Sequence, residues 1–263
     1  HPQKVALPTY PFQRQSYWLT KTANSNSKEV YLPSPERVST TDFYQIQWQE
    51  YPTKLNSQFV IGKIWLVFAS EYLGEQLKVK LNNQQQDCLV ISDRHLDADN
   101  LAPIFNQHPN IGKIIYLTGL DLPQRQTINA ITNYQQQHCT NILNLLQAST
   151  ANSVAAPIWL ATKGHQQIEN ELDTTSIASS CISGLASAIA VEHPESWGGI
   201  VDLDLTPNNN EVDLLIQVVT QANQEDRLAV REDRLYVPRL QTTADIDSPK
   251  SLELSSLGTY LIT

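Results

Sequence analysis

Residues 63–69 read Lys-Ile-Trp-Leu-Val-Phe-Ala, and Ser70 to Gly74 follow them. Such a short run, rich in β-branched and aromatic residues, predicts a buried strand. Residues 73–81 then have the apolar spacing of a helix, and a second short apolar run follows at 87–91. A strand, a helix and another strand in this order are typical of a parallel sheet with helices on its faces.

The same alternation continues toward the C-terminus. Further strand-like runs lie at 44–49, 113–117, 157–162, 199–205, 227–230 and 235–239, and helix-like segments lie at 98–107, 123–147, 176–192 and 212–222. The last two runs flank Arg231-Glu232-Asp233-Arg234 and predict a hairpin with a charged turn. Every fourth residue from Ile177 to Ile189 is apolar, which predicts one buried stripe. We therefore expect an α/β fold with a parallel sheet and helices on both faces.

The first 41 residues have a different character. Prolines and aromatic rings alternate at Pro2, Pro8, Tyr10, Pro11, Phe12, Tyr17 and Trp18. Proline at this density favours an extended backbone. Each ring gains up to ~4–6 kcal/mol on full burial, so we expect an extended strap that lies on a protein surface rather than a free tail. Residues 20–41, rich in Ser, Thr, Asn, Lys and Pro, have the composition of a linker.

Composition limits the function classes. The 263 residues are 41% hydrophobic and 17% charged, as in a globular protein of one large or two small domains. The net charge of -9 argues against nucleic acid and anionic membranes as partners. No apolar stretch approaches the ~20 residues that span a bilayer, and no secretion leader opens the chain.

The three cysteines, Cys88, Cys139 and Cys181, form no CxxC pair, so we expect neither a zinc cluster nor a disulfide framework. A reducing, cytoplasmic location is the prediction that fits this usage. The chain contains no Met and begins with His1 and Pro2, which predicts a piece cut from something longer.

The motifs of catalysis and cofactor binding are missing from the sequence. The nine glycines form no GxGxxG or Walker A string, and Glu71 falls where a pyrophosphate would bind. Ser183-Gly184-Leu185-Ala186-Ser187 lacks the glycine of a nucleophile elbow. His95, in a polar turn, has no partner at a defined spacing, and His193 is interpreted as a helix cap. We therefore expect no catalytic, cofactor-binding or metal-binding residue in this chain.

One further match is rejected. Tyr17 and Lys21 have the YxxxK spacing of short-chain reductases, in which the lysine lowers the pKa of the tyrosine. That chemistry needs both side chains on one face of a helix beside a cofactor. Here the pair lies on the proline-rich strap, so we interpret the match as coincidence.

Two parts of the sequence resemble type I modular polyketide synthases. Residues 7–18, Leu-Pro-Thr-Tyr-Pro-Phe-Gln-Arg-Gln-Ser-Tyr-Trp, resemble the segment that follows the acyltransferase domain in these multienzymes. The remainder is similar to the structural, non-catalytic half of their ketoreductase domain. The matching pieces lie at 44–48, 64–68, 115–121, 158–164, 192–204, 235–240 and 258–263.

The resemblance implies a truncated Rossmann-like fold that binds no cofactor. It implies a partner as well: a catalytic half that carries NADPH and reduces a β-ketoacyl group, held on an acyl carrier protein, to a β-hydroxyacyl group. On this basis residues 1–41 are the linker that follows the acyltransferase domain, 42–254 the structural subdomain and 255–263 the first strand of the catalytic half. We expect the linker to be anchored by Tyr10, Phe12, Tyr17 and Trp18, and the interface between the halves to include Tyr236, Pro238, Arg239, Thr259 and Tyr260.

The sequence departs from the family before Glu192-His193-Pro194, where the usual Trp-Gly and Arg are absent although Gly184 and Leu185 remain. No dehydratase signature separates the strap from Tyr44, so the parent module resembles one with a ketosynthase, an acyltransferase and a ketoreductase. Two alternatives stay open: an adaptor that only positions partners, and a free-standing reductase or transferase that uses His95 or His193.

Overall fold

The computed structural model describes residues 43–51, 62–92, 95–125, 127–168, 176–206, 210–220 and 225–243. The chain divides into one unit at His1–Asp42 and another at Phe43–Thr263, and every described residue belongs to the second. The predictions for the strap, its four aromatic anchors, Thr259 and Tyr260 therefore lie outside the described residues.

Strands and helices alternate along most of the described chain. The strands are β1 (Phe43–Tyr51), β2 (Ile64–Phe68), β3 (Cys88–Ile91), β4 (Ile111–Tyr116), β5 (Ile158–Lys163), β6 (Trp197–Leu203), β7 (Arg227–Arg231) and β8 (Arg234–Thr243). The helices are α1 (Glu71–Asn83), α2 (Ala98–Gln107), α3 (Ile128–Ala151), α4 (Ser180–Glu192) and α5 (Glu211–Thr220), with short 3-10 turns η1 (Thr118–Leu120) and η2 (Ile177–Ser179). Each strand and helix expected from the sequence has a counterpart here.

The strands form one eight-stranded sheet in the order β1-β8-β7-β6-β5-β4-β2-β3. Strands β2 to β7 are parallel to one another, whereas β8 runs antiparallel to both β7 and β1. The sheet is thus mixed: the expected parallel strands, β2 to β7, are extended by antiparallel strands at one edge. The predicted hairpin is the cause: Glu232 and Asp233, both with positive φ, reverse the chain between β7 and β8.

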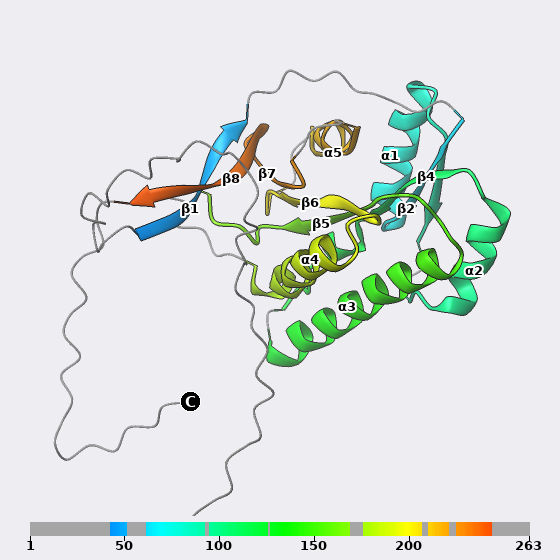
Figure 1. Cartoon of the computed structure of the whole chain (residues 1–263), viewed down its shortest axis with the longest axis horizontal. Coiled ribbons are helices and arrows are strands. Elements are labelled where there is room, and N and C mark those ends of the chain that lie inside the picture. Colours follow the sequence, from blue (N-terminus) through cyan, green and yellow to red (C-terminus); the bar gives the residue numbers. More distant parts are fainter. Residues whose placement is uncertain are drawn as a thin grey trace, which may run out of the picture. The chain divides into compact units, whose positions relative to one another are not determined.

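Two apolar layers cover the sheet, because successive side chains of a strand point to opposite faces. Trp65 and Val67 pack with α1 and α5 on one face, whereas Leu66 and Phe68 pack with α2, α3 and α4 on the other. Figure 1 shows this division, with α1 and α5 on one side and α3 and α4 on the other. The helices therefore cover both faces of the parallel strands, as predicted.

The predicted apolar stripe of α4 is wrong in part. The side chains buried in the core are those of Ala178, Ile182, Ala186 and Ile189, whereas Ile177 is 62% exposed. A spacing of four outruns the 3.6 residues of a helical turn, so a stripe of that spacing rotates around the helix. Ala178 and Ile177 lie in η2, directly before α4, and the small side chain of Ala186 lets α4 pack against β5 and β6.

No helix in the described part of the chain is long and apolar enough to cross a membrane.

Candidate docking surface

Within the described part of the chain, no helix covers one face of the sheet beyond α4, over the antiparallel ribbon of β1 and β8. Alternation along the strands places eight side chains there, two of which, Glu50 and Thr242, lie at its ends. The other six, which we call the open face, are Tyr44, Ile46, Trp48, Tyr236, Pro238 and Leu240. Ile46 pairs with Leu240 and Trp48 with Pro238 across the two strands. Tyr44 is 59% exposed, Ile46 69% and Leu240 70%. A contiguous apolar patch of this kind is typical of a protein-binding surface.

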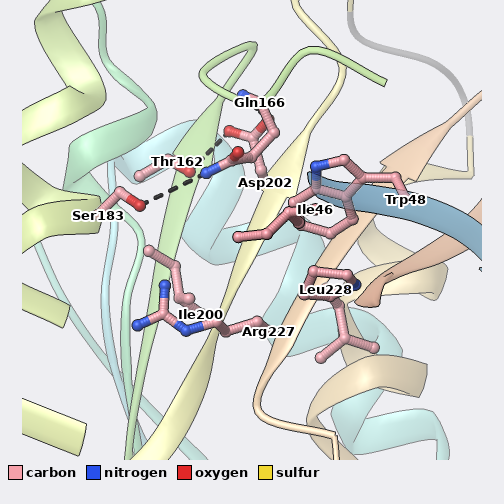
Figure 2. A pocket seen from close by; sticks show the side chains of 10 residues that line it. Ile46, Trp48, Thr162, Gln166, Ser183, Ile200, Asp202, Arg227 and Leu228 are labelled. Carbon is pink, nitrogen blue, oxygen red and sulfur yellow. Dashed lines mark hydrogen bonds between the residues drawn. The ribbon is translucent and has the colours of Figure 1, made fainter. Parts of the chain in front are cut away.

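The open face continues into a cavity of about 300 Å³ beside α4. The described residues that line it are Ile46, Trp48, Thr162, Gln166, Ser183, Ile200, Asp202, Arg227, Leu228 and Pro238. Figure 2 shows Ile46 and Trp48, from β1, opposite the polar side chains of Thr162, Gln166 and Asp202. An apolar wall from β1 and a polar floor from β5, β6 and the loop after β5 thus meet in this cavity.

The polar floor is held together by Asp202, whose side chain is almost fully buried. Its Oδ1 accepts hydrogen bonds from the Thr162 hydroxyl at 2.7 Å and from the His165 backbone N–H at 3.0 Å. Its Oδ2 accepts from the Gln166 backbone N–H at 2.9 Å. These bonds fix the loop that leaves β5, and with it the inner end of the cavity.

Arg231, at the end of β7, neutralises this carboxylate. Its Nη2 lies 2.7 Å from Asp202 Oδ2 and donates to the Gln166 carbonyl at 2.6 Å. Its Nη1 donates to the Val230 carbonyl at 2.8 Å. Because both charged groups are buried, satisfied hydrogen bonds are what make the pair tolerable in the interior. Arg231 therefore is not a solvated turn residue, as its place in the charged string of the hairpin suggests, but part of the core.

Asp202 and Ser183 are the side chains in this cavity that could act as a base or a nucleophile. Both oxygens of Asp202 already accept hydrogen bonds, so the carboxylate is poorly placed to act as a general base. Ser183 lies within α4, as predicted, and its hydroxyl receives only a long bond of 3.5 Å from Gln166 Nε2. The described residues that line the cavity include no His, Cys or Lys.

A second hollow lies at the carboxyl ends of the parallel strands, where doubly wound sheets bind their ligands. The strand order reverses between β2 and β4, and a cavity of about 810 Å³ opens there. Its walls include Glu71, Asp121 and Glu211. The two lysines in the lining are paired: Lys163 Nζ lies 3.3 Å from a Glu211 oxygen, and Lys80 contacts Asp213.

The turn into α1 has one of the three glycines of the dinucleotide-binding motif GxGxxG. Gly74 packs against β3 so closely that a Cβ would clash with Val90 Cγ1, which is the packing role of the third glycine in GxGxxG. Counting back from Gly74, the first two glycine positions hold Ala69 and Glu71. A carboxylate in the first turn of α1 takes the place where the helix dipole would otherwise attract a phosphate. These residues do not fit the pyrophosphate of NADPH.

Of the residues predicted at the interface, Tyr236 and Pro238 lie on the open face, where Tyr236 packs with Trp48. Arg239 lies on the opposite face of β8, and its Nη1 donates to Glu225 Oε2 at 3.1 Å. Of the five predicted residues, Tyr236 and Pro238 thus lie on the open face, and Arg239 lies on the opposite face of β8.

The two histidines considered for catalysis lie next to helix ends. His95 is exposed, and its carbonyl accepts a bond from Asn100 Nδ2 at 2.7 Å in the turn before α2. His193 follows the last residue of α4, with Nδ1 3.5 Å from a Glu195 oxygen, so its interpretation as a helix-end residue is confirmed. No group of three potential metal ligands occurs among the residues that the structure describes.

Sequence reasoning missed Ile46, Trp48 and the Asp202–Arg231 pair as parts of one site. A charged residue inside the apolar run at 199–205 was a usable signal, because a buried carboxylate needs a partner. No local pattern reveals that β1 pairs with β8, almost two hundred residues later.

Comparisons with known proteins agree with this fold. The family model described as "Polyketide synthase extender module SpnB, Rossmann fold domain" matches residues 48–240. Polyketide synthase GfsA of Streptomyces halstedii is 26% identical over 99% of this chain and 4% of its own length. Erythronolide synthase EryA2 of Saccharopolyspora erythraea is 27% identical over 98% of this chain and 7% of its own. The chain therefore spans a small part of each of these multienzymes.

Solved structures show the same fold. A C2-type ketoreductase from a modular polyketide synthase superposes with a TM-score of 0.60 at 23% identity, over 76% of this chain and 44% of that one. The ketoreductase-containing structure of a keto acid-selecting NRPS module gives 0.65 at 15% identity, over 76% of this chain and 18% of that one. With the family model covering most of the sequence, the chain belongs to the family of Rossmann fold domains of polyketide synthase extender modules.

Proposed function

We propose that this chain is the structural, non-catalytic half of a polyketide synthase ketoreductase. Its open face braces a catalytic half that binds NADPH and reduces a β-ketoacyl thioester carried by an acyl carrier protein. The observation that carries this proposal is the apolar open face itself, with Ile46 and Leu240 about 70% exposed on a sheet whose parallel strands are covered on both sides.

The charge of the second hollow, at the carboxyl ends of the parallel strands, supports the assignment of NADPH binding to the catalytic half. Glu71, Asp121 and Glu211 line the place where a Rossmann fold holds its cofactor, and the lysines there are already paired. A phosphate would meet carboxylates rather than free N–H groups and cations, which disfavours binding. NADPH thus belongs to the other half of the domain.

The remaining assignments follow from the same proposal. Residues 1–41 are the linker that follows the acyltransferase domain, with Tyr10, Phe12, Tyr17 and Trp18 as anchors. Residues 42–254 form the structural subdomain, and 255–263 contribute the first strand of the catalytic half, where Thr259 and Tyr260 complete the interface. The multienzyme works in the cytoplasm.

The test is complementation in trans. The chain is mixed with a separately produced ketoreductase catalytic half of its parent synthase, and NADPH-dependent reduction of a β-ketoacyl thioester is followed. We expect the chain alone to be inactive, the catalytic half alone to be weakly active, and the mixture to reduce the substrate at least ten-fold faster.

Two results would contradict the proposal. If the mixture is no faster than the catalytic half alone, the chain is an adaptor that only positions partners. If the chain alone turns over the substrate, and His95→Ala or His193→Ala abolishes that turnover, it is a free-standing enzyme. Calorimetric titration of NADPH into the chain gives an independent check, since micromolar binding would assign the cofactor to this half.

A further inference from the structure

One arginine, Arg227 of β7, lines the cavity beside α4. It pairs in register with Ile200 of β6 and lies two residues before Ala229, which pairs with Tyr236 of the open face. Because alternate residues of a strand share a face, the Arg227 side chain lies on the same side of the sheet as the open face. In Figure 2 its guanidinium lies on the side of α4, and Trp48 lies on the opposite side of the cavity.

The guanidinium of Arg227 is held by a neutral group. Its Nη2 donates to the Ser187 hydroxyl at 2.7 Å, and that hydroxyl donates in turn to the Ser183 carbonyl at 3.0 Å. Among the described residues, no carboxylate oxygen lies within 4.0 Å of an Arg227 nitrogen. The acids nearby have other partners: Asp202 accepts hydrogen bonds on both oxygens, and Asp226 Oδ2 accepts from an indole N–H at 2.7 Å.

A partner bound to the open face would change the surroundings of this charge. Arg227 is partly exposed in the chain, so water still reaches its side chain. Ile46 and Trp48 belong both to the open face and to the wall of the cavity, so a partner that covers them also covers the cavity. A guanidinium that loses its water without gaining a counter-charge is costly, whereas a carboxylate can bind it through two parallel hydrogen bonds. The best partner surface therefore carries an acid at this point.

We infer that the cavity is a receptor for an acidic side chain, aspartate or glutamate, of the catalytic half, and that its carboxylate binds the Arg227 guanidinium. The inference rests on the proposed function, because it names the partner chemistry that the open face selects. Ile46, Trp48 and Pro238 provide an apolar wall for the methylene groups of that side chain. A volume of about 300 Å³ is at the small end of ligand pockets, which suits a side chain better than a cofactor.

The experiment is calorimetric titration of the catalytic half into the full-length chain and its variants. Arg227→Gln removes the charge and keeps a polar side chain, and we expect it to bind about 30-fold more weakly than the wild type. Arg227→Lys keeps the charge but not the planar fork, so it should lose less. The matched control is Arg239→Gln, the same substitution on the opposite face of β8, which should bind as the wild type does. Circular dichroism shows that each variant is folded.

Charge reversal then identifies the acid. Each Asp and Glu of the catalytic half is replaced by Lys, and every variant is titrated into the chain that carries Arg227→Glu. We expect one of these Lys variants to bind Arg227→Glu at least ten-fold more tightly than it binds the wild-type chain.

The failure of this inference differs from the failure of the proposed function. If the wild type binds and Arg227→Gln binds equally well, or if no Lys variant prefers Arg227→Glu, no acid enters the cavity although the open face still binds the catalytic half. If the wild-type chain does not bind the catalytic half at all, the proposed function is wrong and this inference is wrong with it.

Discussion

Replacing Asp202 by alanine tests the idea that a buried ion pair holds the inner end of the cavity. The Asp202 and Arg231 side chains are 3% and 6% exposed, so Asp202→Ala removes the buried carboxylate that faces a buried guanidinium. Breaking such a pair costs about 3–5 kcal/mol. The hydroxyl of Thr162 and the backbone N–H of Gln166 lose their acceptor as well.

That cost is a large share of the free energy of unfolding, which is only about 5–15 kcal/mol for a domain. With an m-value of about 3 kcal/mol/M in urea, a loss of about 4 kcal/mol lowers the midpoint by ~1.3 M. Urea unfolding followed by far-UV circular dichroism measures this shift directly.

Two variants serve as controls for this prediction. Asp204 is 26% exposed and lies 3.7 Å from Arg231 Nε, so Asp204→Ala should cost only about 1 kcal/mol. Adding Arg231→Met to Asp202→Ala removes the buried guanidinium as well and should recover at least ~1 kcal/mol. Equal midpoints for Asp202→Ala and Asp204→Ala, or no recovery in the double variant, would refute the reasoning.

Two further predictions concern packing and pH. Gly74→Ala should destabilise the chain by about 1–3 kcal/mol, because the new Cβ meets Val90. Gly184→Ala, in open space on α4, should stabilise the chain by about 0.5–1 kcal/mol. Equal effects of the two substitutions in thermal melts would contradict this prediction. Burial lowers the pKa of Lys113 from 10.5 to about 8, so between these values the unfolded chain binds more protons. Stability should therefore rise with pH across that window, and urea titrations of Lys113→Met should show the rise abolished.

Local patterns were enough to predict most of the elements. The run at 63–69 and the helix at 98–107 follow from composition and period, and α2 spans the residues expected of it. A capping box between Asp97 and Asn100 sets where that helix begins. These features depend on neighbours in the sequence, which is why sequence reasoning finds them.

The site itself depends on contacts between distant residues. Trp48 and Pro238 become neighbours only because β1 pairs with β8, and Asp202 meets Arg231 across β6 and β7. Ile177 is exposed because another side of the helical segment packs against the sheet, and the spacing of the apolar residues does not determine that side. Such choices are made by tertiary packing, so the sequence pattern leaves them open.

The central claim, that the open face binds the catalytic half, is tested most directly by calorimetric titration of that half into the chain and its variants. Ile46→Glu places a charge at the centre of the open face, whereas Gln45→Glu places the same charge on the opposite side of β1. We predict saturable binding for the wild type and Gln45→Glu, and binding at least ten-fold weaker for Ile46→Glu. Equal affinity of Ile46→Glu and the wild type would contradict the account.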